Sequence, residues 1–308
     1  MPPPASAPAS AAFYTAQSPY SDPGALASCY VGLPRDPVQL ARVVRGLLVH
    51  RREGDVFGQT LDEERVREDA QSRYVDELLR LVTERDEAPL TSPRTPADRF
   101  VGVSRDFALL HTSLLRHVGI PARVRCGFAD YFGHDGFHGA FHEEHAVTEF
   151  WDARRGWVLA DPQLMDRRVA GALGIDFAPM DVPRGRFLVS GRAWHALRAG
   201  EADPLAFGAR EGAGDGAWGT AKPPTGVECA AGVVRLDLAA LNRHETLLWD
   251  VWGTRVPYPR YDEVATLTGD EVPFDAARAF FRDDEALRVP RTVRSEPPYG
   301  EAVEVTLR

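Results

Sequence analysis

One set of residues, Ser104, His145 and Asp161, has the types and spacing that nucleophilic catalysis requires. Ser104 lies in the stretch GVSRDFA over residues 102–108, which predicts a small nucleophilic side chain in the first turn of a helix. Backbone N–H groups in that turn have no partner within the helix and point toward incoming negative charge. A hydroxyl placed there is a candidate for attack on a carbonyl carbon.

His145 and Asp161 supply the groups that would activate such a hydroxyl. His145 opens a predicted strand, and Asp161 ends the next predicted strand, directly before Pro162. Neighbouring antiparallel strands can bring the two side chains together, so that His145 takes a proton from Ser104 while Asp161 fixes its tautomer. Spacing alone does not decide this, because each residue could instead be a helix cap, a surface histidine or a turn aspartate.

The elements that must position these residues follow from the hydrophobic pattern. Residues 104–117 repeat apolar side chains at helical spacing, and Gly119 and Pro121 predict the end of that helix. Strands are expected at residues 123–128, 145–151 and 157–160, with a loop rich in glycine and histidine at 133–142 and a turn at 152–156. The core order is therefore helix, strand, loop, strand, turn, strand.

The rest of the chain is expected to elaborate one domain over residues 26–308, with the catalytic core at about 99–166 and a C-terminal elaboration at 167–308. Residues 1–25 are rich in Pro, Ala and Ser and are predicted to be disordered, or held only by Phe13, Tyr14 and Tyr20. Further predicted elements are helices at 37–52, 61–84, 193–199, 234–249 and 274–281 and a glycine-rich loop at 208–219.

Three motifs resemble the transglutaminase-like superfamily and occur in its order. They are GVSRDFALLHTSLLRHVGIPARVRCGF, HAVTEFWD and GWVLADPQL, within about residues 99–166. The resemblance implies an α+β, papain-like fold in which a nucleophile helix packs on an antiparallel sheet, with helical N-terminal and mixed C-terminal elaborations. It also implies acyl transfer or amide hydrolysis without a cofactor, with Ser104, His145 and Asp161 at the nucleophile, base and orienting positions.

Ser104 departs from the family pattern, which has cysteine at this position. A cysteine beside a histidine can rest as a thiolate, whereas a serine hydroxyl must lose its proton during attack. Three explanations stay open: a working serine nucleophile, an engineered change from cysteine, or a binding module that has kept the fold. Cys126, on the strand after the nucleophile helix, is interpreted as a buried apolar residue and not as a substitute.

Substrate contacts are expected from Arg105, His142 and Glu144. His134, His138, His142 and His145 recur at short intervals and could bind zinc, which keeps a metal-dependent hydrolase as a further alternative. Their glycine-rich surroundings form a poor helix, so the spacing does not place them on one face. No metal site is therefore expected, and a loop that gates the substrate is favoured.

Composition limits the partners of the chain. The net charge of -9 argues against a nucleic-acid groove, which needs a basic stripe. No apolar run is long enough to span a membrane, and three distant cysteines favour a cytoplasmic protein over a disulfide framework. The expected substrate is an amide or thioester in a small molecule, a peptide or a carrier protein.

Overall fold

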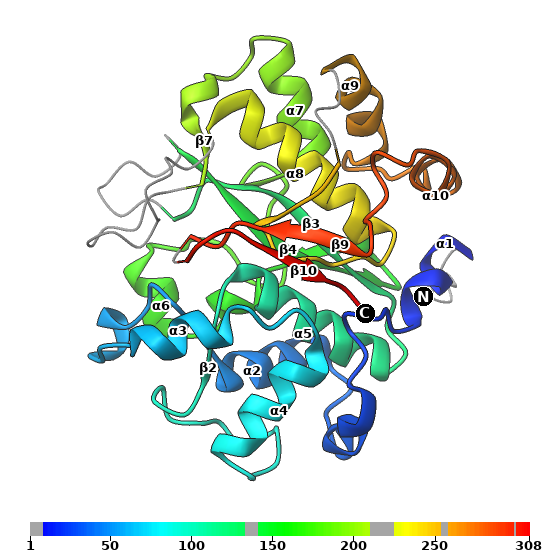
Figure 1. Cartoon of the computed structure of the whole chain (residues 1–308). Helices are drawn as coiled ribbons and strands as arrows, with labels where there is room; N and C mark the ends of the chain where they lie inside the picture. Colours follow the sequence, from blue (N-terminus) through cyan, green and yellow to red (C-terminus); the bar gives the residue numbers. More distant parts are fainter. Residues whose placement is uncertain (1–8, 133–140, 210–224, 254–257, 299) are drawn as a thin grey trace. The chain divides into compact units, whose positions relative to one another are not determined.

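The computed structural model describes residues 9–132, 141–209, 225–253, 258–298 and 300–308. Contacts divide the chain into two compact units, one of residues 1–124 with 147–183 and the other of residues 125–146 with 184–308. Figure 1 labels their helices and strands along the chain. The boundary falls inside two strands, β3 (Ala122–Ala129) and β4 (His142–Asp152), so both strands contribute residues to both units. A single domain over residues 26–308 remains a prediction.

The main sheet has the strand order β5-β4-β3-β6, and β7 also pairs with β4. The first unit holds β5 (Gly156–Ala160), which pairs antiparallel with β4, and a separate parallel pair of β1 and β2. Its other elements are α1 (Ala9–Ala12), α2 (Pro37–Leu47), β1 (Leu48–His50), α3 (Glu63–Asp69), α4 (Val75–Arg85), β2 (Phe100–Gly102), α5 (Ser104–His117) and α6 (Arg167–Ala172).

Helix α5 packs on the sheet of the first unit, as the fold class predicts. Its residues from Ser104 to Arg116 are all buried, and the Thr148 hydroxyl of β4 donates to the Ala108 carbonyl at 3.1 Å. On the same strand Glu149 pairs with Arg123 of β3 at 2.7 Å. The predicted helix at 104–117 and the α+β class with an antiparallel sheet are confirmed.

Two alternatives were expected for residues 1–25, disorder or a segment held only by Phe13, Tyr14 and Tyr20. For residues 9–25 the structure favours the second, since they form helix α1, a 3₁₀ helix at Phe13–Thr15 and the start of another at Gly24–Tyr30. Tyr14 and Tyr20 are buried, and their rings contact Trp157 and Tyr74 at 5.6 and 5.3 Å between centroids. Aromatic burial of this kind offsets the chain entropy lost by a segment rich in Pro and Ala. Residues 1–8 lie outside the described residues.

Two predicted helices of the first unit are shorter than expected. The helix predicted at 37–52 ends at Leu47 because the chain then pairs in parallel with β2. The helix predicted at 61–84 is interrupted between α3 and α4, where the Asp69 carboxylate is fully buried and pairs with Arg85 at 2.5 Å. The same carboxylate accepts the N–H of Val101 at 2.7 Å, so the break ties this segment to β2.

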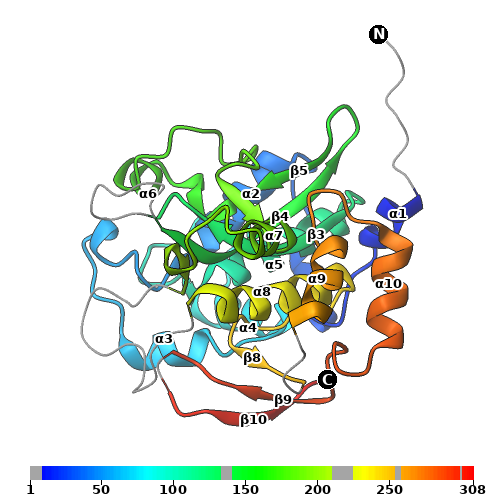
Figure 2. The same cartoon turned by 90° about the horizontal axis from the view of Figure 1, so that it is seen from above.

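The second unit combines four helices with short strands among its described residues. The strand β6 (Phe187–Val189) pairs antiparallel with β3, and β7 (Phe207–Gly208) pairs in parallel with β4. Figure 2 shows β9 between β8 and β10 in a separate antiparallel sheet. The helices are α7 (Ser190–Arg198), α8 (Gly226–Leu241), α9 (Tyr258–Leu267) and α10 (Phe274–Asp283), and the strands are β8 (Asp250–Val251), β9 (Thr292–Ser295) and β10 (Val303–Thr306).

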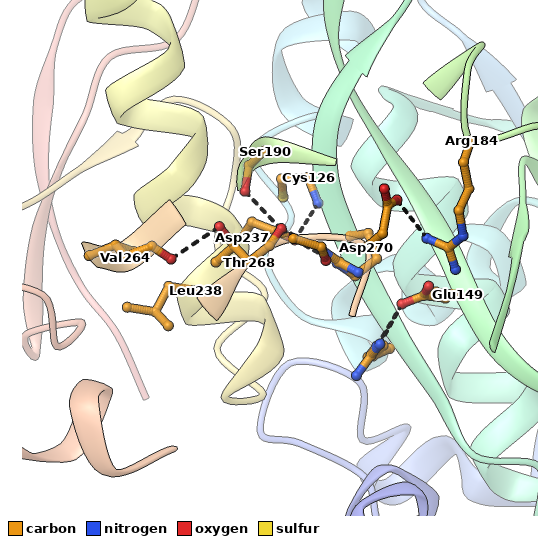
Figure 3. Close-up of polar contacts among 12 residues, drawn as sticks. Cys126, Glu149, Arg184, Ser190, Asp237, Leu238, Val264, Thr268 and Asp270 are labelled. Atoms are coloured by element: carbon orange, nitrogen blue, oxygen red, sulfur yellow. Dashed lines mark hydrogen bonds and ion pairs between the residues drawn. The ribbon is translucent and has the colours of Figure 1, made fainter. Parts of the chain in front are cut away.

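A buried ion pair joins strand β3 to helix α8 in the second unit. Arg125 and Asp237 are both fully buried, with Nη2 of the guanidinium 3.0 Å from Oδ2 of the carboxylate. Figure 3 shows that Asp237 also accepts the Ser190 hydroxyl at 2.9 Å and the N–H of Cys126 at 2.8 Å. Arg125 donates to the Thr268 carbonyl, so one pair connects β3, α7, α8 and the end of α9.

Sequence periodicity predicted the helices and strands of the second unit less accurately than those of the first. The helix predicted at 234–249 is α8 at Gly226–Leu241, because its first turns bury small residues such as Ala230 and Ala231 that carry little periodic signal. The helices predicted at 193–199 and 274–281 correspond to α7 and α10. Helix α9 and the strands of the separate sheet were not predicted. Among the described residues, no helix is long and apolar enough to cross a membrane.

The stability of the first unit is expected to fall at acid pH because of His111, which is fully buried in α5. Its Nε2 donates to the Pro37 carbonyl at 3.2 Å, and burial lowers its pKa to about 4. The unfolded chain takes up a proton below its ordinary pKa of about 6.5, while the folded chain resists until about pH 4. As the pH falls between those values, the buried neutral His111 lowers the free energy of unfolding progressively, by up to about 3 kcal/mol.

Urea unfolding of His111→Gln and the parent at several pH values measures this cost. We expect the free energy of unfolding of the variant to rise steadily relative to that of the parent as the pH falls from 7.5 to 4. His195→Gln, which replaces an exposed histidine in α7, is the control. A constant gap between parent and His111→Gln over that range would contradict the prediction.

Loss of the Asp237 carboxylate is expected to destabilise the second unit strongly. Asp237→Ala leaves the guanidinium of Arg125 buried and uncompensated, which should cost about 3–5 kcal/mol. Asp270→Ala is the matched control, since Asp270 pairs with Arg184 at 3.1 Å but both side chains are about one third exposed. The control should cost less than about 1 kcal/mol. Equal losses in the two variants, measured by chemical unfolding, would refute the distinction.

Candidate active site

Ser104 is the first residue of helix α5 and is buried, with 5% of its surface exposed. Strand β2 delivers it, since β2 ends at Gly102 and pairs in parallel with β1 in the register Val49 to Val101 and His50 to Gly102. The Arg51 N–H also donates to the Gly102 carbonyl at 3.0 Å. The prediction that Ser104 lies in the first turn of a helix is therefore confirmed, and its role as the nucleophile stays a prediction.

The next two residues explain why the helix begins there. Asp106 accepts the N–H of Val103 at 2.9 Å through Oδ2, a cap that satisfies a backbone donor before the first helical turn. Arg105 pairs with Asp106 at 3.2 Å and donates to the carbonyls of Ser72 and Arg73, between α3 and α4. Burial raises the pKa of Asp106, and the Arg105 charge opposes that rise.

Arg105 was expected to contact substrate, and its surroundings do not support that role. Its side chain is 1% exposed and its guanidinium donates to the backbone of residues 72 and 73. A guanidinium held in this way packs the start of helix α5 against the α3–α4 connection. An adjacent pair such as Arg105 and Asp106 at a helix start is more often structural, and a substrate contact of Arg105 stays a prediction.

Asp161 directly follows β5 and is 1% exposed. Its N–H donates to the Pro179 carbonyl at 2.7 Å, and its Oδ1 accepts the N–H of Gln163 at 3.0 Å, which caps the 3₁₀ helix Pro162–Met165. These contacts fix the backbone and one carboxylate oxygen of Asp161. The predicted place of this residue, at a strand end before Pro162, is confirmed.

Glu53 connects the Asp161 turn to β1, the strand that pairs with β2. Its Oε1 accepts the Gln163 side-chain amide at 3.2 Å, and its Oε2 accepts from Arg45 at 2.7 Å and from the His50 N–H at 3.0 Å. Burial raises the pKa of Glu53, and Arg45 and the two other donors oppose that rise. His50 faces Gly102 in the β1–β2 register, so Glu53 joins Gln163 to the strand that pairs with β2.

His145 lies in β4 within the second unit and is 4% exposed. Three aromatic rings of the same unit surround its imidazole: Phe132 at 4.6 Å, Tyr131 at 5.9 Å and Phe187 at 6.3 Å between centroids. Ring packing on several sides restricts the rotation of an imidazole. The residue predicted as the base is therefore held in place by its own unit.

Ser104 and Asp161 belong to the first unit, and His145 belongs to the second. The predicted contacts of His145 with Ser104 and with Asp161 remain predictions.

Comparison with known protein families identifies the segment that carries all three residues. Residues 55–162 match the family model described as the transglutaminase-like superfamily. This segment therefore resembles a transglutaminase-like core. No curated protein and no solved structure matches the chain. The resemblance drawn from the three motifs is thereby confirmed, and the matched segment begins before the predicted core, at η3 (Asp55–Phe57) ahead of helices α3 and α4.

The other residues expected to touch substrate, His142 and Glu144, lie on β4 within the matched segment. His142 stacks on Phe207 at 4.5 Å, and its pKa is lowered by burial. Burial and the charge of Glu143 raise the pKa of Glu144 to about 8. Burial, and next the Glu144 charge, raise the pKa of the Cys229 thiol in α8. Substrate binding by His142 and Glu144 stays a prediction.

The alternative metal site is only partly open to inspection. His134 and His138 lie outside the described residues. Within the ranges that the structure describes, no group of three or more His, Cys, Asp or Glu side chains could hold a metal ion.

Sequence reasoning missed Glu53 and Gln163, although both contact the turn or strand that positions a predicted catalytic residue. Gln163 could have been found from the sequence, because it lies two residues after the candidate orienting carboxylate Asp161 and its side-chain amide can form hydrogen bonds near that turn. Glu53 gave no comparable signal, because 110 positions separate it from Gln163 along the chain.

The Asp106 carboxylate that caps the Val103 N–H leaves no room for a side chain at Gly102. A Cβ there would lie 2.9 Å from Oδ2 of Asp106 and 3.1 Å from the Phe100 ring, both of which are buried. Gly102→Ala is therefore expected to displace the carboxylate and to cost about 1–3 kcal/mol of stability. Gly171→Ala in α6 is the control, since nothing lies within 4 Å of its Cβ position, and it should be neutral or stabilising. A Gly102→Ala variant as stable as the control in thermal unfolding would disprove the packing argument.

Proposed function

We propose that the chain is a transglutaminase-like acyl transferase or amidase that acts on an amide or thioester. Ser104 is the nucleophile, His145 the base that takes its proton, and Asp161 the carboxylate that orients His145. The observation that carries the proposal is that one family match spans all three positions, with Ser104 at the buried start of α5.

The register of the sheet supports a pairing of His145 with Asp161. Thr148 faces Ala160 in the last pair of the β4–β5 register, and Asp161 and Val147 are the residues that follow and precede that pair. His145 lies two residues before Val147 on the same strand, and side chains two apart in a strand point to the same side. Diagonal neighbours across antiparallel strands are within reach of long side chains.

The chemistry that these residues would perform has two half-reactions. Ser104 Oγ attacks the acyl carbon as its proton moves to His145, and the leaving amine or thiolate takes that proton. The resulting ester is then attacked by an amine or by water, with His145 again accepting and returning a proton. The N–H groups at the start of α5, foremost that of Ser104 itself, are the candidate donors to the negative oxygen of each tetrahedral intermediate.

The acyl donor is proposed to be a small molecule, a peptide or a carrier-protein thioester, in the cytoplasm. A serine in a site suited to cysteine acylates slowly, because no anion is preformed. A binding module that keeps the fold is the alternative, and it differs in one respect: it forms no covalent intermediate.

Mass spectrometry of the protein incubated with amide and thioester donors tests the proposal. We expect an acyl adduct on Ser104 that is absent in Ser104→Ala and strongly reduced in His145→Ala. Ser104→Cys should acylate about tenfold faster or more, which corresponds to about 1.4 kcal/mol in barrier height, because its thiolate is already formed.

The outcome against the proposal is equally defined. A donor panel that yields no adduct with Ser104 or with Ser104→Cys, while the folded protein binds one of the donors reversibly, would favour the binding module. An adduct that forms equally well in His145→Ala would remove His145 from the mechanism.

A further inference from the structure

We propose that Gln163 and Glu53 are positioning residues for Asp161, and that they set the reactivity of the nucleophile through the His145–Asp161 pair. This inference rests on the proposed function and extends it to two residues that touch neither substrate nor the reacting atoms. Both are buried, with 3% and 4% of their surfaces exposed, and both lie in the first unit.

Gln163 holds Asp161 through two different groups. Its backbone N–H donates to Oδ1 of Asp161 at 3.0 Å, which leaves the other carboxylate oxygen to the remaining partners of that residue. Its side-chain amide donates to Oε1 of Glu53 at 3.2 Å. Among the described residues, Oε1 of the Gln163 amide is buried with no hydrogen-bond partner. The Gln163 side chain therefore acts as a hydrogen-bond donor to Glu53 and not as an acceptor.

Glu53 is itself held by groups that belong to the nucleophile side of the core. Arg45 donates to its Oε2 at 2.7 Å, and the Arg45 guanidinium lies over the ring of Phe107 in helix α5, 5.5 Å from its centroid. The His50 N–H donates to the same oxygen at 3.0 Å, at the end of the strand that pairs with β2. The chain of contacts therefore runs from helix α5 and β1 through Glu53 to the Asp161 turn.

A carboxylate that orients a catalytic histidine must be placed accurately, because a displacement of about 1 Å can cost two orders of magnitude in rate. The Asp161 turn is a short 3₁₀ helix, in which hydrogen-bond geometry is poor. Its side-chain anchor to Glu53 supplies a restraint that the 3₁₀ helix alone lacks. If this anchor is cut, Asp161 should stabilise the imidazolium of His145 less well.

The experiment measures the effect of Gln163 and Glu53 on the His145–Asp161 pair through the pKa of a thiol introduced at position 104. In Ser104→Cys, an imidazolium at position 145 stabilises the thiolate at position 104, so the pKa of that thiol reports on the His145–Asp161 pair. The rate of alkylation by iodoacetamide is measured against pH, by mass spectrometry of the peptide that contains residue 104. Cys29→Ser is added because Cys29 is half-buried, whereas Cys126 and Cys229 are buried.

Three variants are compared in this background: Gln163→Leu, which removes the amide at similar volume, Gln163→Asn, which is one methylene shorter, and Glu53→Gln. We expect each to raise the apparent thiol pKa by roughly half a unit to one unit, toward the value of Asp161→Asn. Such a shift lowers alkylation about threefold to tenfold at a pH below the thiol pKa.

Ser113→Ala is the matched control for general destabilisation. Ser113 is buried at the other end of α5, where its hydroxyl contacts Tyr30 at 2.7 Å and donates to the Ser21 carbonyl at 2.6 Å. Its loss should weaken the fold without changing the thiol profile. Thermal unfolding is measured to check that each variant is folded at the assay temperature. If Gln163→Leu is unfolded there, the comparison relies on Gln163→Asn.

The outcomes separate this inference from the proposed function. If His145→Ala and Asp161→Asn raise the thiol pKa while the Gln163 and Glu53 variants match the parent, the positioning role is refuted and the proposed function stands. If His145→Ala and Asp161→Asn also leave the profile unchanged, the catalytic pair is absent and both proposals fail. A shift in Ser113→Ala equal to that in Gln163→Leu would show that the effect is only loss of stability.

Discussion

Helix α5 can begin at a buried position because the carboxylate of Asp106 accepts the N–H of Val103. A helix start carries unpaired N–H groups, and burying them without acceptors would cost more than the packing of the helix returns. Gly102, which leaves room for this carboxylate, and Arg105, which pairs with it, depend on the same contact. The residues around Ser104 are thus explained first by the helix start, in which Asp106 caps the N–H of the residue directly before Ser104.

Buried carboxylates of this kind recur among the described residues and join segments that are distant in sequence. Asp69 ties α3 to α4 and β2, Glu53 ties β1 to the Asp161 turn, and Asp237 ties β3 to α7 and α8. Removal of two charges from water costs several kcal/mol per ion, so such pairs add little net stability. Each pair satisfies directional donors that an apolar contact could not, and this fixes backbone positions at the site.

Local pattern predicted those parts of the fold that local physics determines. Helix α5 and the strand end at Asp161 follow from apolar periodicity and from Gly119, Pro121 and Pro162, and the structure confirms them. The break between α3 and α4 could not be predicted, because the Asp69 partners Arg85 and Val101 lie 16 and 32 positions away. The order of residues 9–25 depends on contacts of the same long-range kind.

The same distinction separates the nucleophile from the residues that support it. A motif records residue types at fixed spacing, so it finds Ser104, His145 and Asp161 and cannot find Glu53, whose contacts are made in space alone. Serine in place of cysteine makes that support more important. A hydroxyl gains nothing from a resting anion, and in the proposed mechanism its attack depends on how well His145 is oriented at the moment of proton transfer. Under the proposed function, a serine site therefore needs a firmly held Asp161 more than a cysteine site does.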